Sequence, residues 1–345
     1  MERKKLLMLN PIEYEHKFDK NALNVVKKIP GLKSVFRKKL QDYERYETVL
    51  NTGSSVKVTS THFSEIHDIL KEACANIHLN YIPEMYIGSS WMNGPSGWDV
   101  NACTLGYDNP MILLSPGSVE YLTPDELLYV IGHEAGHIKS GHVLYHTMIN
   151  TMSYLGSAIT QISFGLNDLL ENSLNQSIDY MMNYWSRMSE FTADRAGLLA
   201  CQDIDVAINV EMKLCGVPPK LYDEMNTDEF IKQAKEFENF KNLEKYYKKL
   251  VESNRTHPWG VIRAFELLKW IESGRYHQIL DIHTECKLEE LQRTCMKCGT
   301  KLNKDEKFCG DCGSKPEIAN CSKCGTNLGG EEAFCGVCGE RLWIR

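Results

Sequence analysis

The order of apolar and polar residues predicts a chain built mainly from helices, together with one short hairpin of strands. Helices are expected at residues 61–77, 186–201, 204–215 and 227–240. Two strands are expected at residues 99–105 and 111–115, separated by a turn with the sequence GYDNP. This pattern predicts an α+β fold, in which a mainly helical domain contains a small mixed sheet.

Another helix is predicted to begin near residue 124, and it carries a cluster of polar residues. Thr123 and Glu126 form a capping box, and Pro124 occupies the first helical position, where its missing N–H costs nothing. An apolar face follows at helical spacing, and after it comes the sequence GHEAGHIKSGH, with three histidines and one glutamate. The capping box therefore fixes how these polar residues are arranged around the helix.

His133 and His137 are four residues apart, so their imidazoles share one face of this helix and can bind one metal ion. Glu134 is rotated by about 100° from His133, which suits a base beside a metal-bound water better than a metal ligand. Glu190 and Asp194 are also four apart on a predicted helix. Glu190 could complete a His₂Glu zinc site while Asp194 orients an imidazole. Considered alone, this acidic pair is more typical of a solvated helix face.

Composition and charge narrow the classes of partner. The chain has 345 residues, of which 43% are hydrophobic and 25% are charged, as in ordinary soluble globular proteins. Its net charge of −7 offers no electrostatic attraction to nucleic acid or to anionic lipid, so neither is an expected partner. The first residues lack the apolar run and cleavage site of a secretory signal, which predicts a cytoplasmic protein with reduced thiols.

Eight of the thirteen cysteines lie after residue 294, in four Cys-x-x-Cys pairs. Residues 295–313 and 321–339 are two copies of one motif, identical at 12 of 19 positions. Four thiolates from two such pairs surround one tetrahedral Zn²⁺, whereas redox motifs do not occur as duplicated pairs. The predicted ligands of the two structural zinc ions are Cys295, Cys298, Cys309 and Cys312, then Cys321, Cys324, Cys335 and Cys338.

The function of these two predicted zinc ribbons is suggested by their charge. With two zinc ions and eight thiolates counted, residues 293–345 carry a net charge of about −2. This charge disfavours nucleic acid and favours the docking of a protein partner.

Residues 140–167 contain no Asp, Glu, Lys or Arg. Polar side chains are nevertheless spread through the segment, and each would cost desolvation in a bilayer, which disfavours a membrane span. We expect it to continue the active-site helix and then to form an amphipathic helix or a lid over the cleft. His142, near its start, is rotated off the ligand face and is predicted to lie outside the metal site.

Three separated segments now point to one family. VNACTLGYDNPMILLSPGSVEYLTPDELLYVIGHEAGHIKSGH, SRMSEFTADRAG and THPWGVIR resemble, in order and spacing, the HtpX-like and CAAX-prenyl-protease-type zinc metallopeptidases, which are gluzincins. The resemblance covers roughly residues 80–270. It implies that His133, His137 and Glu190 bind the catalytic zinc, that Glu134 is the general base and acid, and that Asp194 supports a ligand.

The resemblance also implies roles outside the two helices. His257 matches a family histidine that stabilises the oxyanion, although by itself a histidine before a proline is more typical of a loop. Arg263 is expected to be structural. An edge strand lines the cleft in this family, so Asn101 and Ala102 would pair with substrate backbone; a plain edge strand is the alternative of equal weight.

Three regions are therefore predicted. Residues 1–55 form an N-terminal extension that packs on the core, residues 56–280 form the zinc metallopeptidase domain, and residues 293–345 form tandem zinc ribbons. The predicted function is zinc-dependent endopeptidase activity on proteins or peptides, with one catalytic and two structural zinc ions. The alternative is a non-catalytic zinc-stabilised scaffold that binds a partner. Glu134 argues against it, because a structural His₂Glu site has no use for a base.

Overall fold

The computed structural model describes residues 3–27, 32–88, 99–106, 108–147, 149, 168–240 and 257–285, with the short pieces 310, 319–320 and 327–328. These residues are mainly helical and include a small sheet, which confirms the predicted fold class. The helices are α1 (Pro11–Tyr14), α2 (Lys17–Lys27), α3 (Leu32–Ser54), α4 (Ser64–Asn76), α5 (Pro116–Tyr121), α6 (Pro124–Lys139), α8 (Asp168–Cys201), α9 (Ile204–Leu214), η1 (Pro219–Glu224), α10 (Thr227–Glu238), α12 (Gly260–Glu272) and α13 (Arg275–Glu285).

The main sheet has the strand order β1 (Val56–Lys57), β2 (Glu84–Ile87), β4 (Met111–Leu114) and β3 (Ala102–Leu105). β3 and β4 form the predicted antiparallel hairpin, while β2 and β4 run parallel. All four residues of β4 are buried, because this central strand is covered on both faces. β3 lies at the edge of the sheet. A separate antiparallel pair is formed by β5 (Ala319–Asn320) and β6 (Asn327–Leu328).

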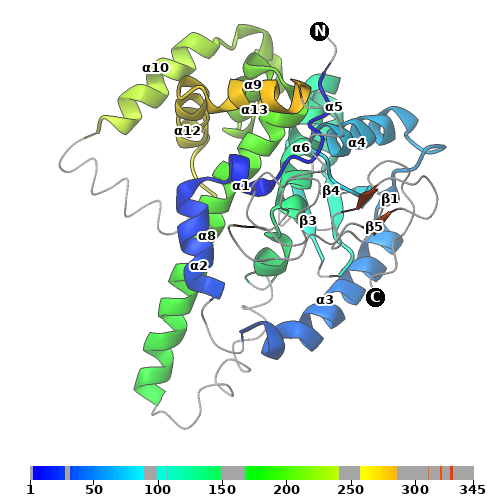
Figure 1. The fold of residues 1–345 in the computed structure, drawn as a ribbon, viewed down its shortest axis with the longest axis vertical. Coiled ribbons are helices and arrows are strands. Elements are labelled where there is room, and N and C mark those ends of the chain that lie inside the picture. The colour runs from blue at the N-terminus through cyan, green and yellow to red at the C-terminus, as the bar shows by residue number, and fades with distance from the viewer. Residues whose placement is uncertain are drawn as a thin grey trace.

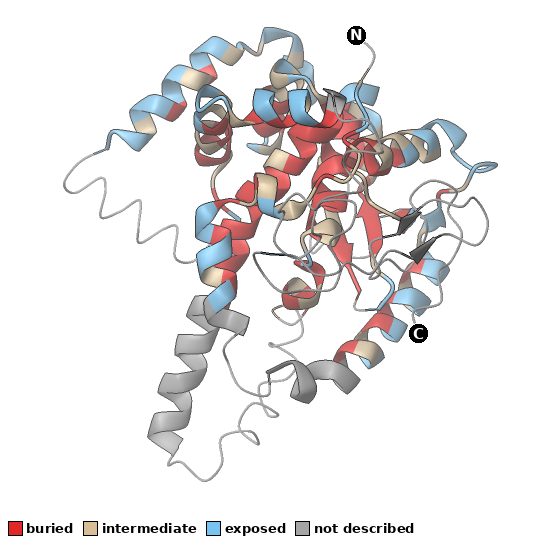
Figure 2. Ribbon diagram, viewed as in Figure 1, coloured by how far each residue is buried: buried red, intermediate tan, exposed pale blue. Residues whose placement is uncertain are grey.

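The long helix α8 crosses the molecule, with the sheet on one side and α10 and α12 on the other (Figure 1). The predicted start of α6 is confirmed, since Thr123 caps it and Glu126 completes the capping box. α6 packs against α8, α4 and β3, so it is buried from several directions. Figure 2 shows that buried residues are concentrated in α6, in the adjoining part of α8 and in β4. The polar motif of α6 therefore lies in the centre of the domain.

Small residues allow α6 and α8 to approach closely. A Cβ atom added to Gly132 would lie 2.3 Å from Cβ of Ala200, and one added to Gly136 would lie 2.4 Å from Cβ of Ala196. Neither position accepts a side chain at this separation. Because Gly132 and Gly136 precede His133 and His137 by one residue each, this contact sets how far the histidines lie from α8.

The N-terminal residues pack on this helical core. Leu6 and Tyr14 are fully buried, and α2 lies along α8. Nε2 of His16, just before α2, lies 3.2 Å from the carboxylate of Glu266 in α12. Burial raises the pKa of Glu266, but hydrogen bonds from His16 and Lys269 outweigh it and lower that pKa to about 2. The start of α2 is thus tied to α12 by the partly buried carboxylate of Glu266.

α3 reaches the other side of the domain. The carboxylate of Glu44 accepts hydrogen bonds from the backbone N–H groups of Asp108 (3.1 Å) and Asn109 (2.6 Å), in the turn between β3 and β4. These contacts hold α3 beside the edge strand. In this position α3 lines the cleft that opens onto the polar motif of α6.

α6 ends at Lys139 and residues 143–147 are again helical after a turn, so the expected unbroken continuation of the active-site helix is wrong. Ser140 caps the helix, and Gly141 adopts a φ of 71°, a left-handed conformation that favours glycine. Residues 148 and 150–167 lie outside the described residues, and with them the predicted amphipathic helix or lid. Among the helices in the described part of the chain, none is long and apolar enough to cross a membrane.

Candidate metal centre

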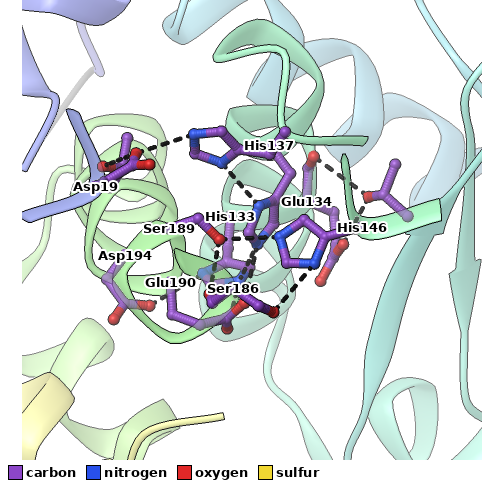
Figure 3. A network of polar contacts seen from close by, with 12 residues as sticks. Asp19, His133, Glu134, His137, His146, Ser186, Ser189, Glu190 and Asp194 are labelled. Carbon is purple, nitrogen blue, oxygen red and sulfur yellow. Dashed lines mark hydrogen bonds and ion pairs between the residues drawn. The ribbon is translucent and has the colours of Figure 1, made fainter. Parts of the chain in front are cut away.

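Two histidines of α6 and one glutamate of α8 converge on one buried point. Nε2 of His133 and Nε2 of His137 are 3.1 Å apart, and the Glu190 carboxylate lies 3.5 Å from the first and 3.4 Å from the second. Figure 3 shows these three side chains turned toward one another. Tetrahedral zinc with bonds of 2.0–2.1 Å separates its ligand atoms by about 3.3 Å. The donor set therefore fits a zinc ion in both chemistry and spacing.

Glu190 is ionised in this buried position. Burial by itself raises the pKa of Glu190, but the charge of His257 and the contacts with His133 and His137 lower it well below its usual range. A buried carboxylate with a depressed pKa is prepared to bind a cation without first losing a proton.

Asp194, one turn further along α8, holds His133 from behind. Its Oδ1 lies 3.0 Å from Nδ1 of His133, so the ring keeps a proton at Nδ1 and would use Nε2 to bind a metal ion. Arg263 donates to both carboxylate oxygens, from Nε to Oδ2 at 3.0 Å and from Nη2 to Oδ1. Asp194 thus lies where the sequence placed it, and Arg263 neutralises its buried charge.

Two further residues of this cluster were not found from the sequence. Glu211 of α9 lies 3.2 Å from Arg263, and the hydroxyl of Tyr129 donates to Glu211 at 3.0 Å. Burial raises the pKa of Glu211 to about 8, because the lowering effect of Arg263 is offset by the negative charge of Asp194. Glu211 therefore holds a proton at neutral pH while Asp194 carries the charge. Tyr129, Glu211 and Arg263 lie on three separate helices, α6, α9 and α12, so the periodicity of the sequence does not connect them.

His137 also has a partner behind it. His142, predicted to lie outside the ligand set, places its Nδ1 atom 3.0 Å from Nδ1 of His137. His146 lies beside both rings, and these three histidines are close enough to hold a metal ion themselves. His137 is therefore in contact with two further histidines, which the spacing of the motif did not predict.

The carboxylate of Glu134 is oriented by the edge strand. The hydroxyl of Thr104 donates to Oε2 of Glu134 at 2.6 Å, and both residues are buried. This contact fixes the candidate base beside the histidines. Thr104 was not singled out from the sequence, because only the packing of β3 on α6 reveals its partner.

A cleft of about 1050 Å³ opens onto this site. His257, which is exposed at the start of the segment leading to α12, lines it together with His133, Glu134 and Glu190. α3 also lines the cleft, through Tyr43, Tyr46, Glu47 and Leu50. No pattern in the sequence indicated that part of the N-terminal extension borders the cleft.

The register of β3 shows which backbone groups of the expected substrate-binding strand already have partners. The backbone N–H of Asn101 donates to the hydroxyls of Ser115 (3.1 Å) and Ser118 (2.9 Å), and its carbonyl accepts from the backbone of Ser115 (3.0 Å). Asn101 is therefore turned inward. Since backbone groups alternate along a strand, Ala102 and Thr104 direct theirs to the open edge, where the N–H of Ala102 donates to Oδ1 of Asn101 at 2.9 Å. The pairing of Asn101 and Ala102 with substrate stays a prediction, and the backbone groups of Asn101 already have partners within the domain.

The eight ribbon cysteines lie outside the described residues. Their sequence is nevertheless matched by a family model, the double zinc ribbon, over residues 295–339. A second model, peptidase family M48, matches residues 60–271 and so spans the helices and the sheet described above.

Individual relatives agree with these two matches. The chain is 31% identical over 277 residues to the plastoglobule-localized metallopeptidase 48, chloroplastic, of Arabidopsis thaliana, which covers 79% of this chain and 76% of that protein. It is 30% identical over 109 residues to a protease HtpX homolog of Helicobacter acinonychis, 31% of this chain and 33% of that one. The chain therefore belongs to peptidase family M48 and is a zinc-dependent metalloprotease with a double zinc ribbon, which decides against the non-catalytic scaffold.

Proposed function

We propose that this protein is a zinc endopeptidase in which His133, His137 and Glu190 hold the catalytic zinc and Glu134 is the general base. The convergence of three ligand atoms at 3.1–3.5 Å, beside a buried and oriented carboxylate, carries this proposal. A protein or peptide is the substrate, as membership of a protease family requires.

Different residues of the chain have different roles in the proposed reaction. Bound zinc would polarise the scissile carbonyl and make the attacking water more acidic. Glu134 accepts a proton from that water and returns it to the leaving amine, and its hydrogen bond from Thr104 keeps it aimed during both transfers. His257, at the exposed rim of the cleft, stabilises the negative oxygen that develops on the substrate.

The edge strand provides a binding surface for an extended substrate. Ala102 and Thr104 direct backbone groups outward, so a peptide can add to β3 as a further strand. The tyrosines of α3 also line this cleft. This arrangement places a backbone segment beside the metal centre without requiring a particular sequence.

The ribbons complete the proposal. Two structural zinc ions, each bound by four of the cysteines between residues 295 and 338, would make this region a compact docking module for a protein partner or for the substrate. The cytoplasmic location stays a prediction from the sequence.

Substitution Glu134→Gln tests the role of the base. We expect kcat for peptide cleavage to fall by about 10²–10⁴-fold while the zinc content is unchanged, because the amide cannot accept the proton. Glu120→Gln, at an exposed position of α5, is the matched control and should retain full activity. His133→Ala should lose one zinc ion per chain together with activity. Full cleavage by purified Glu134→Gln would refute the assignment.

A further inference from the structure

We infer that Asp19 of α2, acting through His142, positions His137 for zinc, so that the N-terminal extension contributes a residue to the metal centre. This inference rests on the proposed function, since it takes His137 as a zinc ligand. It assigns positioning roles to two residues that the motif leaves outside the site.

Three side chains form a continuous line of contacts behind the candidate ligands. Nδ1 of His142 lies 3.0 Å from Nδ1 of His137, and Nε2 of His142 lies 3.0 Å from Oδ2 of Asp19. Asp19 is at the outer end of this line (Figure 3). The exposed fractions of the His142 and Asp19 side chains are 1% and 0%, so water does not compete for these hydrogen bonds.

The geometry allows one consistent arrangement of protons. Nε2 of His137 faces His133 and Glu190, so it must present a lone pair to a metal, and the proton of this ring sits on Nδ1. His137 therefore donates to Nδ1 of His142. That leaves the proton of His142 on Nε2, from which it donates to Asp19. Every donor in the line meets an acceptor, and the line ends on a carboxylate.

The carboxylate at the end of the line is itself fixed by α8. Trp185 donates from Nε1 to Oδ1 of Asp19 at 2.9 Å, and the hydroxyl of Thr192 donates to Oδ2 at 2.6 Å. Burial raises the pKa of Asp19, but the contact with His142 and the hydrogen bonds from Thr192 and Trp185 outweigh it and lower that pKa. Asp19 is thus an ionised acceptor held in one orientation.

The two candidate histidine ligands are consequently supported from opposite sides. Asp194 contacts His133 directly, whereas Asp19 reaches His137 through one intervening imidazole. Carboxylate support of this kind fixes ring orientation and raises ligand basicity, and its loss weakens metal binding by about 10–100-fold. One supporting carboxylate comes from α8, which also carries Glu190, and the other comes from α2, well before the histidine motif.

A second metal site at the same three histidines is the competing assignment, because His137, His142 and His146 also lie close together. His146 is engaged elsewhere, with Nε2 at 2.9 Å from the hydroxyl of Ser189 and Nδ1 at 3.3 Å from that of Ser186. A metal there would also have to displace the Nδ1 proton of His137. The hydrogen-bonded line avoids both costs.

Matched substitutions in the full-length protein test the inference. Asp19→Asn removes the charge, and His142→Leu removes the acceptor for His137. His142→Gln keeps an acceptor and a donor in similar places, so it should rescue. Glu266→Gln is the control, because it loosens the start of α2 through His16 without touching the line of contacts. Circular dichroism establishes that each variant is folded.

The first measurement is zinc affinity by chelator competition, with the catalytic zinc defined as the fraction that His133→Ala lacks. We expect the dissociation constant of that zinc to rise by about 10–100-fold in Asp19→Asn and His142→Leu. It should stay within about threefold of the parent value in His142→Gln and Glu266→Gln. The visible absorption of the cobalt-substituted protein should change in the first two variants only, because it reports ligand geometry.

Three outcomes would overturn the inference. Parental zinc affinity in His142→Leu would remove His142 from the site, and a loss in Glu266→Gln equal to that in Asp19→Asn would leave only helix docking. A further zinc ion that disappears in His142→Leu and in His146→Ala would establish the second metal site instead. A separate result, full zinc content in His133→Ala, would mean that the proposed metal centre itself is wrong.

Discussion

The close contact between α6 and α8 leads to a quantitative prediction for Gly136→Ala. The new Cβ would lie 2.4 Å from Cβ of Ala196, whereas carbon atoms pack at 3.5–4.0 Å, so the two helices must separate by about 1.1–1.6 Å at this level. Zinc sites tolerate errors of only about 0.2 Å in their bond lengths. His137 and Glu190 sit on the two helices that move apart, so their shared metal should be lost first.

The free energy of unfolding should change less than zinc binding does. Overpacking costs about 1–3 kcal/mol, while replacing a helical glycine by alanine recovers up to about 1 kcal/mol. We therefore expect Gly136→Ala to remain folded but to bind catalytic zinc at least about tenfold more weakly. Chelator competition measures the affinity, and urea denaturation of the metal-free protein measures the stability.

Two variants separate a steric effect from a general effect of alanine. Gly53→Ala in α3 meets no atom within 4 Å, so it should stabilise the protein by up to about 1 kcal/mol and leave zinc affinity unchanged. Gly136→Ala combined with Ala196→Gly moves the methyl group to the other helix and should restore most of the affinity. Parental zinc binding by Gly136→Ala, or no recovery in the double variant, would refute this account of the helix contact.

Three further predictions follow from individual contacts. Thr104→Val should lower kcat about tenfold at constant zinc content, because Glu134 loses the hydrogen bond that aims it; steady-state kinetics would show this, and a parental kcat would contradict it. Arg263→Lys should lower the free energy of unfolding, measured by urea titration, by at least about 2 kcal/mol, because one ammonium cannot bind both oxygens of Asp194 as the guanidinium does. An unchanged urea midpoint would count against this role of Arg263. Glu266 has a pKa of about 2 in the folded protein against an ordinary 4.5, so the stability that it contributes is present above pH 4.5 and is lost as the pH falls toward 2. Glu266→Gln should therefore make the melting temperature of the metal-free protein less steeply dependent on pH in this range. Equal slopes of melting temperature against pH in the parent and the variant would show that Glu266 is not responsible.

Much of the local structure was predictable because its causes lie within a few residues. The capping box at Thr123 acts over three positions, and it fixes the start of α6 and the side on which His133 and His137 lie. The hairpin of β3 and β4 follows from a turn sequence between two apolar runs. The end of α6 was misjudged because an apolar, charge-free stretch continues past Gly141, and periodicity does not register one residue with a positive φ.

By itself, the sequence determined the fold class, the pairing of His133 with His137 on one face of a helix, and the duplicated cysteine motif, because each is a matter of spacing along the chain. Spacing shows which face a residue occupies but not what meets that face. Only the tertiary structure decided that Thr104 orients Glu134, that the backbone of Asn101 is turned inward, and that α2 brings Asp19 to His142. These partners lie far apart in the chain, up to the separation of Asp19 from His142, and they meet only because separate helices and strands pack around one buried site.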